Sequence, residues 1–412
     1  MTHHPKQSLR VLVIAAHYPP SSAAAAIRAR NIVRNLQSLG HRVKVITART
    51  PHEGEPPPEA RAVPWLDLER LAKSALRGDT SVAQAPRPPR AWQRGLRTVA
   101  ARLVVPDLHA PWIPMATALA RRLVGPADVV LSTGGASAHV VARLIRGARP
   151  WIADINDIWW RNPHQVAGAL RERIDWRFER GVIGSAAAVT VPNDALGAEI
   201  RRRFGRSPAT IFTGFDVAEF DLPRNGRRTS TREIIFAGTL YADFRLSLLL
   251  EALAKGREGC GWSSSTLRVV FIGSGAGQAV AAAKAHGVHD FVEGVSPVPR
   301  GELLKRLVDA DATVVPLYPS DHHLPMRFFD SVGSGRPMIG VGSPNADAAE
   351  MIQRHELGAV CSDVDTLTSV LDGIVRAPRA ADLPLETRRL FDRASSRPAL
   401  RQVLERLPPP TP

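Results

Sequence analysis

The chain opens with strand, helix and strand patterns in that order, and this order constrains the fold more than any other feature. Residues 10–16 form a continuous apolar run, which is typical of a strand that is covered on both faces of a parallel sheet. From residue 24 the apolar positions follow helical spacing up to Gly40, and residues 41–47 form the next strand pattern. Two such strands joined by a helix predict a doubly wound α/β sheet.

Strand and helix patterns continue to alternate through the first half of the chain. The further strand patterns lie at residues 127–133, 150–155, 187–191 and 209–213. Two stretches that are rich in proline and charged residues, 51–64 and 79–95, interrupt the series and are interpreted as surface loops.

A polar linker at residues 222–231 separates this series from a second one. The strand patterns of the second series are 233–237, 267–272, 289–293, 312–316 and a segment around residue 339. We therefore predict an N-terminal domain at 1–221 and a C-terminal domain at 222–387. A C-terminal helix, at about 388–412, is expected to pack back on the first domain.

Composition excludes several classes of protein. The net charge of +15 favours anionic substrates or an anionic membrane surface as partners. Nucleic acid is disfavoured, because the basic residues form no run interleaved with aromatic residues. The two cysteines, Cys260 and Cys361, have no His or Cys neighbours at ligand spacing, so neither a disulfide framework nor a zinc site is predicted. We recognise no membrane span and no signal peptide, and expect a cytoplasmic protein.

Residues 316–340 carry the pattern that is most informative about chemistry. Arg327 stands three positions before Asp330, and one turn of helix would place both side chains on one face. A guanidinium can hold a phosphate, and a carboxylate can accept hydrogen bonds from sugar hydroxyls. This pair would suit a ligand that is part diphosphate and part polyol.

Two glycine turns follow strand patterns in the second half of the chain. Gly273-x-Gly275 is similar to a dinucleotide-binding fingerprint, but Gln278 replaces its third glycine, so a nicotinamide or flavin enzyme is disfavoured. Gly238 ends another strand pattern, and Arg245 follows seven residues later, where it could contact a diphosphate.

Five motifs follow one another along the chain: Tyr18-Pro19-Pro20, Asp154-Ile-Asn-Asp157-Ile-Trp159, Phe212-Thr-Gly214-Phe215-Asp216, Val292-Glu-Gly294-Val-Ser296 and Pro325-x-Arg327-x-Phe-Asp330 followed by Gly335-Arg336-Pro337. Taken in this order, they resemble retaining family 4 glycosyltransferases of the GT-B fold, and among them the bacterial branch that builds surface polysaccharides. The likeness covers nearly the whole chain. It implies two Rossmann-like, doubly wound α/β domains that face each other across a cleft.

The resemblance also implies roles for individual residues. The residues implied in catalysis are Asp157, Arg327 and Arg245. The residues implied in donor binding are Ser21, Ser22, Ala23, Gly238, Thr239, Gly273, Val295, Ser296, His322, Phe329 and Asp330. The residues implied in acceptor binding are Asp154, Asn156, Arg161 and Arg28. No metal and no cofactor are expected, since the nucleotide-sugar is a co-substrate.

The chain departs from the family pattern at several positions. Ser21, Ser22 and two alanines replace a diglycine phosphate loop, and Thr239 stands where an arginine often follows the glycine. Many members have two glutamates with seven residues between them, and here these positions are His322 and Asp330. The shorter aspartate could select a different donor sugar or reduce activity.

The implied reaction moves a sugar from a nucleotide-sugar to an acceptor hydroxyl, with retention and without a metal. The acceptor is either a lipid-linked saccharide or a secondary metabolite. In the first case the basic stretch 87–102, with apolar residues among its arginines, would contact the inner face of the membrane. Two alternatives remain open, a catalytically degenerate nucleotide-sugar-binding protein and a nucleotide-sugar epimerase on the same fold.

Overall fold

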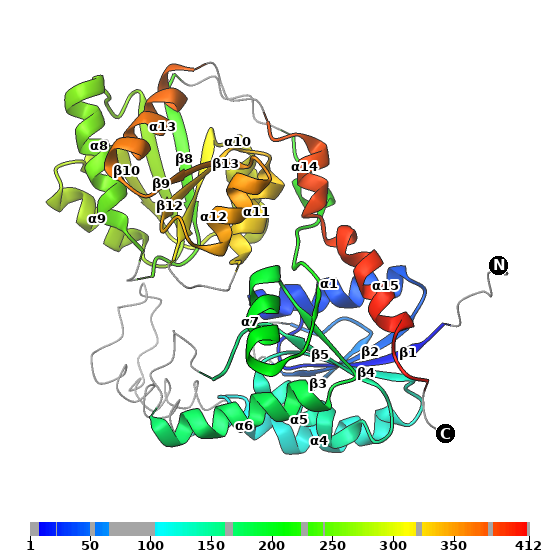
Figure 1. Ribbon diagram of the computed structural model, residues 1–412. Helices are drawn as coiled ribbons and strands as arrows, with labels where there is room; N and C mark the ends of the chain where they lie inside the picture. Colours follow the sequence, from blue (N-terminus) through cyan, green and yellow to red (C-terminus); the bar gives the residue numbers. More distant parts are fainter. Residues whose placement is uncertain are drawn as a thin grey trace, which may run out of the picture. The chain divides into compact units, whose positions relative to one another are not determined.

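The chain folds into two compact units, each built on one parallel sheet (Figure 1). The first unit comprises Met1–Phe212 with Ser396–Pro412, and the second comprises Thr213–Ser395. The computed structural model describes residues 8–21, 23–49, 54–65, 104–160, 168–223, 230–241, 244–318, 324–377 and 382–409.

The sheet of the first unit has seven parallel strands in the order β3-β2-β1-β4-β5-β6-β7. In chain order they are β1 (Arg10–Ala15), β2 (Arg42–Ala48), β3 (Ala60–Val63), β4 (Val129–Gly134), β5 (Trp151–Ile155), β6 (Ala188–Val191) and β7 (Ala209–Thr210). Every residue of β5 is buried, as expected for a central strand with helices on both faces.

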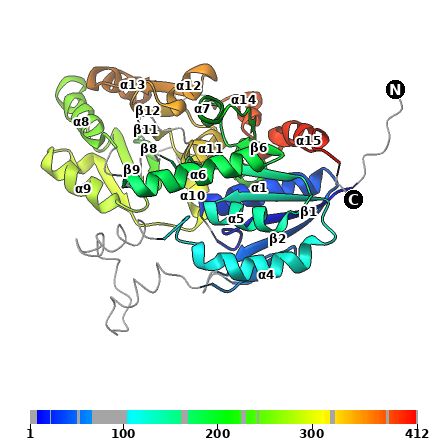
Figure 2. The same ribbon diagram turned by 60° about the horizontal axis from the view of Figure 1, so that its bottom comes forward.

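Helices cover both faces of this sheet. One face packs against α4 (Ile113–Val124), which follows the short η1 (Ala110–Trp112), and against α5 (Ala136–Ile145), α6 (Ala169–Ser185) and α7 (Asp194–Phe204). The other face packs against α1 (Ala24–Ser38) and the C-terminal α15 (Arg397–Glu405), which lie side by side (Figure 1 and Figure 2). Leu400, Val403 and Leu404 of α15 are buried there, so the end of the chain completes the core of the first unit.

The sheet of the second unit has six parallel strands in the order β10-β9-β8-β11-β12-β13. In chain order they are β8 (Arg232–Ala237), β9 (Leu267–Ile272), β10 (Val292–Val295), β11 (Ala312–Leu317), β12 (Met338–Gly342) and β13 (Gly358–Cys361). The short helices η2 (Val217–Phe220) and η3 (His289–Phe291) precede β8 and β10.

The second sheet is also covered on both faces (Figure 1). The helices α8 (Leu246–Cys260), α9 (Ala276–Ala285) and α13 (Val364–Arg376) cover one face, and α10 (Arg300–Asp309), α11 (Met326–Ser334) and α12 (Asp347–Arg354) cover the other. The chain then passes through α14 (Leu385–Leu390) and η4 (Arg393–Ser396). Across the described ranges, we find no helix with both the length and the apolar character needed to cross a bilayer.

Local sequence explains where several helices begin and end. The side chain of Asn193 accepts a hydrogen bond from the amide of Leu196 (2.8 Å) and so caps the start of α7. Asp363 caps α13 in the same way. Gly205 and Gly335 follow α7 and α11 with φ angles of 66° and 74°, a backbone region that glycine adopts without strain.

The order of strands reverses once in each sheet. The chain runs outward from β1 through β2 to β3 and then returns to β4 on the other side of β1. In the second unit it runs from β8 through β9 to β10 and returns to β11. Open α/β sheets bind ligands outside the carboxyl ends of their strands, beside such reversals. The loops after β1, β4, β8 and β11 are therefore the places to look for a site.

The predicted fold class, two doubly wound Rossmann-like sheets, is confirmed. The prediction that residues 51–64 form only a surface loop is wrong, because β3 pairs with β2 at the edge of the first sheet. β3 spans only four residues and follows a run of prolines, so it is too short to stand out in the sequence. Residues 289–293, predicted as a strand, begin as η3. The stretch 79–95 lies outside the described residues.

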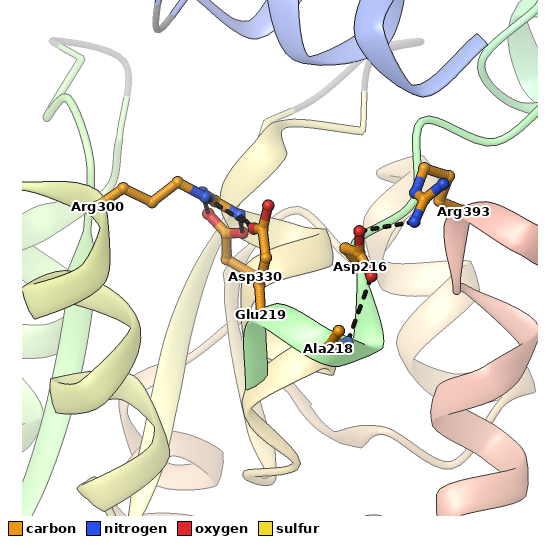
Figure 3. Close-up of polar contacts among 6 residues, drawn as sticks. All are labelled: Asp216, Ala218, Glu219, Arg300, Asp330 and Arg393. Atoms are coloured by element: carbon orange, nitrogen blue, oxygen red, sulfur yellow. Dashed lines mark hydrogen bonds and ion pairs between the residues drawn. The ribbon is translucent and has the colours of Figure 1, made fainter. Parts of the chain in front are cut away.

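The chain passes from the first unit to the second at residue 213, before the expected boundary at 222. The amide of Phe215 donates to the carbonyl of Phe391 (3.2 Å), and the carbonyl of Phe215 accepts from the amide of Arg393 (2.8 Å). The guanidinium of Arg393 also pairs with the carboxylate of Asp216 (2.6 Å; Figure 3). These contacts bind the two crossing segments together within the second unit, and the chain rejoins the first unit at Ser396.

Candidate functional site

The glycine turns that follow β8 and β9 meet at the carboxyl edge of the second sheet. The amide of Gly238 donates to the carbonyl of Ile272, and the amide of Leu240 donates to the carbonyl of Ser274, both at 2.8 Å. Gly273 has a φ of 132°, and a Cβ at this residue would lie 2.5 Å from the carbonyl oxygen of Gly238. Only glycine permits this approach, which brings the two turns into backbone contact.

The turn after β10 joins the same edge. The amide of Gly273 donates to the carbonyl of Val295 (3.0 Å), and the next residue, Ser296, is exposed. The predicted donor residues Gly238, Thr239, Gly273, Val295 and Ser296 therefore come together at the ends of three neighbouring strands.

Arg327, in the first turn of α11, lies against this edge. Its Nη2 donates to the carbonyl of Thr239 (2.7 Å), and its guanidinium carbon lies 4.8 Å from the centroid of the Phe236 ring. Its Nη1 is buried and has no hydrogen-bond partner among the described residues. Burial lowers the pKa of Arg327, yet a guanidinium remains protonated at neutral pH. A cation with an unpartnered N–H group is thus held at the strand-order reversal between β8 and β11.

Asp330, one helical turn later, has a different partner. Arg300, the first residue of α10, donates through Nη2 to Asp330 (3.0 Å) and to Glu219 (2.8 Å), and we call these three residues the Arg300 cluster (Figure 3). Burial raises the pKa of the Asp330 carboxyl, and Arg300 opposes this change. Arg327 and Asp330 therefore have different partners in the fold, the carbonyl of Thr239 and the guanidinium of Arg300.

Two other predicted residues lie away from the glycine turns. Phe329 is fully buried, with its ring edge-on to Phe328 at 5.5 Å between centroids, so the prediction of a donor contact is wrong and the residue belongs to the core. Arg245 is exposed and precedes α8, and its Nη1 donates to the carbonyl of Ser362 (3.3 Å), just beyond β13. Its guanidinium therefore points toward the far edge of the sheet, and the structure does not bring it to Arg327.

The Gly335-Arg336-Pro337 motif has a structural explanation. Gly335 ends α11, and the buried Arg336 donates from Nε to the carbonyl of Val308 (3.0 Å) at the end of α10. Arg336 also pairs with Asp382 (3.3 Å). These contacts fix the end of α11 and so the direction of the helix that carries Arg327.

In the first unit the loop after β1 leads into the N-terminus of α1. The Oγ of Ser21 accepts a hydrogen bond from the amide of Ala23 (3.4 Å), and Ala23 occupies the N-cap position, where its methyl group cannot cap the helix. The first-turn amides of α1 and the helix dipole favour an anion at this end.

Arg28 and Asp154 form a closed, buried network in the first unit. Arg28 donates to both carboxylate oxygens of Asp154, at 2.9 and 2.5 Å, and to the carbonyl of Ile211 (2.7 Å). Thr133 and Thr190 also donate to Asp154, at 2.6 and 2.7 Å. Asp154 is 0% exposed, so the predicted acceptor role of this pair is wrong, because the pair instead joins α1 to β5 in the interior.

The turn after β5 carries Asn156 and Asp157. The carboxylate-bearing Asp157 is exposed, whereas the Oδ1 of Asn156 is buried and has no hydrogen-bond partner within the part of the chain that the structure describes. Glu179 of α6 accepts hydrogen bonds from the amides of Trp159 (3.0 Å) and Trp160 (3.2 Å). Burial raises the pKa of Glu179 to about 7. The turn thus exposes the carboxylate of Asp157 at the edge of the sheet, while the buried carboxylate of Glu179 binds the backbone of the turn.

Some predicted features cannot be placed. Ser22, Arg161 and His322 lie outside the described residues, as does the stretch 87–102 that was expected at a membrane surface. In contrast, sequence reasoning missed Arg300 and Glu179. Both belong to a chain with many arginines and glutamates, and no local motif marks them, because their importance comes from burial and from partners that are distant in sequence.

Comparison with known proteins finds a likeness to one protein family within the first unit. Residues 23–213 match the family model described as "Glycosyl transferase 4-like domain". A search of curated protein sequences finds no match.

Solved structures share the two-sheet fold over almost their whole length. Sucrose-phosphate synthase from Thermosynechococcus elongatus is 14% identical with a TM-score of 0.65, over 97% of this chain and 98% of that chain. Anabaena HepE in complex with UDP and glucose is 12% identical with a TM-score of 0.64, over 97% and 100% of the two chains. WaaG, a glycosyltransferase involved in lipopolysaccharide biosynthesis, is 15% identical with a TM-score of 0.58, over 96% and 95%. These likenesses show that the chain shares the two-sheet fold of these proteins.

Proposed function

We propose that this protein is a retaining, metal-independent glycosyltransferase that moves a sugar from a nucleotide-sugar to an acceptor hydroxyl. The observation that carries the proposal is the position of Arg327. Its buried Nη1 has no hydrogen-bond partner in the described part of the chain. The guanidinium lies beside two glycine turns at a strand-order reversal, which is where α/β sheets bind nucleotides. The glycosyltransferase domain match over residues 23–213 supports the reaction class.

The donor binds at the carboxyl edge of the second sheet. The guanidinium of Arg327 and the backbone of the turns at Gly238 and Gly273 hold its diphosphate, and the nucleoside lies toward Val295 and Ser296. When the bond between the anomeric carbon and the phosphate oxygen breaks, negative charge grows on the departing nucleoside diphosphate. A fixed guanidinium in a partly buried site stabilises this charge without having to reorganise. The HepE structure, which contains UDP and glucose, supports a nucleotide-sugar as the donor class.

The acceptor hydroxyl is positioned by Asp157 of the first unit. Its oxygen forms the new bond to the anomeric carbon, and its proton goes to the Asp157 carboxylate or to the departing phosphate. Retention follows when the acceptor approaches from the side on which the phosphate leaves. The first-turn amides of α1 provide further hydrogen-bond donors for an anion. The acceptor is a lipid-linked saccharide or a secondary metabolite.

A second candidate is a nucleotide-sugar-binding protein that no longer transfers the sugar. The Arg300 cluster favours it, because Asp330 is paired with Arg300 and is not offered to sugar hydroxyls. An enzyme would therefore need other groups to hold the donor sugar.

Incubation with UDP-, GDP- and dTDP-linked sugars separates these candidates. Nucleoside diphosphate release is measured with and without EDTA, and the anomeric configuration of the product is read by NMR. We expect release from at least one donor that EDTA does not reduce and that Arg327→Ala abolishes. Binding of a donor without release supports the second candidate, and the absence of both binding and release refutes the assignment.

A further inference from the structure

Side chains from two helices of the first unit, α6 and α7, bind the turn after β5, and both contact Trp160. Glu179 on α6 accepts the amide hydrogens of Trp159 and Trp160 at 3.0 and 3.2 Å, one on each carboxylate oxygen. Arg203 on α7 donates from Nη1 to the carbonyl of Trp160 (2.7 Å), and its guanidinium carbon lies 5.1 Å from the centroid of the Trp160 indole. The amide and the carbonyl of Trp160 are thus both bound by charged side chains.

The two anchors are themselves fixed. Glu179 is 0% exposed, and Arg203 forms an ion pair with Glu199 one helical turn earlier. Burial of the Glu179 carboxylate lowers the stability of the fold, because burying a carboxylate opposes its ionisation. Burial raises the pKa of Glu179 to about 7, with Asp175 of α6 raising it further and Arg203 and the two bound amides lowering it. This loss of stability occurs at the carboxyl end of a central strand, where ligands bind in such sheets, and it indicates that the position of the turn matters for function.

We propose that Glu179 and Arg203 are positioning residues, which hold the 156–160 turn so that Asp157 keeps one orientation toward the acceptor. The inference rests on the proposed function, since the role of Asp157 does. Removal of Glu179 takes away the acceptor of the Trp160 amide, and removal of Arg203 takes away a donor to the Trp160 carbonyl. Either change loosens the turn that carries Asp157 three residues earlier. The second unit holds neither anchor, so donor affinity is unaffected.

The chain offers a matched control for Arg203. Arg202 pairs with the same Glu199, but it is exposed and has no contact with the turn among the hydrogen bonds of the described residues. Arg203→Ala and Arg202→Ala therefore both remove a partner of Glu199, and only Arg203→Ala also removes the donor to the carbonyl of Trp160. Glu179→Gln keeps the shape of the side chain and one acceptor oxygen but removes the second acceptor.

The test combines hydrogen–deuterium exchange with hydrolysis kinetics. We expect the amides of residues 157–160 to exchange at least about tenfold faster in Arg203→Ala and Glu179→Gln than in the wild type, and unchanged in Arg202→Ala. With UDP-glucose, GDP-mannose and dTDP-glucose as probes, kcat for hydrolysis should fall at least about tenfold in the first two variants, with KM within about twofold of the wild type. Arg203→Lys should recover part of kcat.

The outcomes distinguish this inference from the proposed function. Unchanged exchange in Arg203→Ala, or an equal rise in Arg202→Ala, overturns the positioning role. A fall in kcat that Arg202→Ala shares overturns it as well. If the wild type consumes none of the three probes, the proposed function fails, and the exchange experiment alone decides whether the two anchors hold the turn.

Discussion

Replacing Glu179 with glutamine tests directly whether an ionisable group is buried beneath the turn after β5. Glu179 is 0% exposed, and burial raises its pKa from the ordinary value of 4.5 to about 7. Each pKa unit corresponds to about 1.4 kcal/mol of differential interaction, so this shift is worth about 3 kcal/mol of folding free energy.

The sign of the effect follows from proton linkage. Below pH 4.5 the carboxyl is protonated in both the folded and the unfolded chain, and its contribution to stability is fully present. As the pH rises through 7, the unfolded chain has already released its proton while the folded chain must ionise a buried group. Glutamine does not titrate. The free energy of unfolding of the wild type, minus that of Glu179→Gln, should therefore fall by about 3 kcal/mol between about pH 4 and pH 8.

Urea unfolding followed by tryptophan fluorescence is the appropriate assay, because all tryptophans except Trp262 belong to the first unit. Asp128→Asn provides a control of opposite sign, since Arg10 lowers the pKa of Asp128 and the corresponding difference should rise with pH. A wild-type minus Glu179→Gln difference that is flat, or that rises with pH, would refute the reasoning.

Three further variants test the packing around the site. Arg300→Ala leaves the buried Asp330 without the Arg300 cation and should lower the free energy of unfolding by about 2–3 kcal/mol, a value reduced because Arg300 is one-third exposed. Adding Asp330→Asn should recover most of this loss. Both are measured by urea unfolding followed by circular dichroism. Gly273→Ala places a Cβ 2.5 Å from a carbonyl oxygen at a φ of 132°. This variant should have a lower melting temperature and should not bind UDP, GDP or dTDP. Full binding of these diphosphates would contradict the packing of the two glycine turns. Asp154→Ala removes the carboxylate that pairs with the buried Arg28 and should cost about 3–5 kcal/mol. A normal melting temperature with a raised acceptor KM would instead restore the acceptor role.

The doubly wound fold could be predicted because its signals are local. Continuous apolar runs such as residues 10–16, followed by helical spacing and a glycine, specify a buried strand and a crossover helix within about 40 residues. The edge strand β3 could not be predicted in this way. It is four residues long, and only its pairing with β2 makes it a strand.

The candidate site was predicted in part, for a related reason. Gly238, Gly273 and Arg327 could be recognised because glycine turns and a cation near them have direct chemical meaning. The partners of buried charges have no such signal. The sequence motif predicts that Asp154 binds the acceptor. In the fold, however, the Asp154 carboxylate accepts hydrogen bonds from two threonines and from Arg28, which is 126 residues away.

The same limit applies to Asp330. Helical spacing correctly places Asp330 one turn after Arg327, but it does not reveal that Asp330 pairs with Arg300 while Arg327 donates to Thr239. Ion pairs between elements distant in sequence depend on the packing of α10 against α11, which no pattern within either helix encodes. These are the positions where a structure changes the interpretation of a motif.

Binding of nucleoside diphosphates to the wild type and to Arg327→Ala tests the central claim most directly. Titration calorimetry with UDP, GDP and dTDP, and with the corresponding nucleosides, separates the contribution of the phosphates from that of the base. We expect at least one diphosphate to bind the wild type and to lose about 10–100-fold in affinity in Arg327→Ala, while its nucleoside binds both proteins equally. Equal affinity of that diphosphate for both proteins, or no binding to the wild type, would contradict the assignment of Arg327 to the donor phosphates.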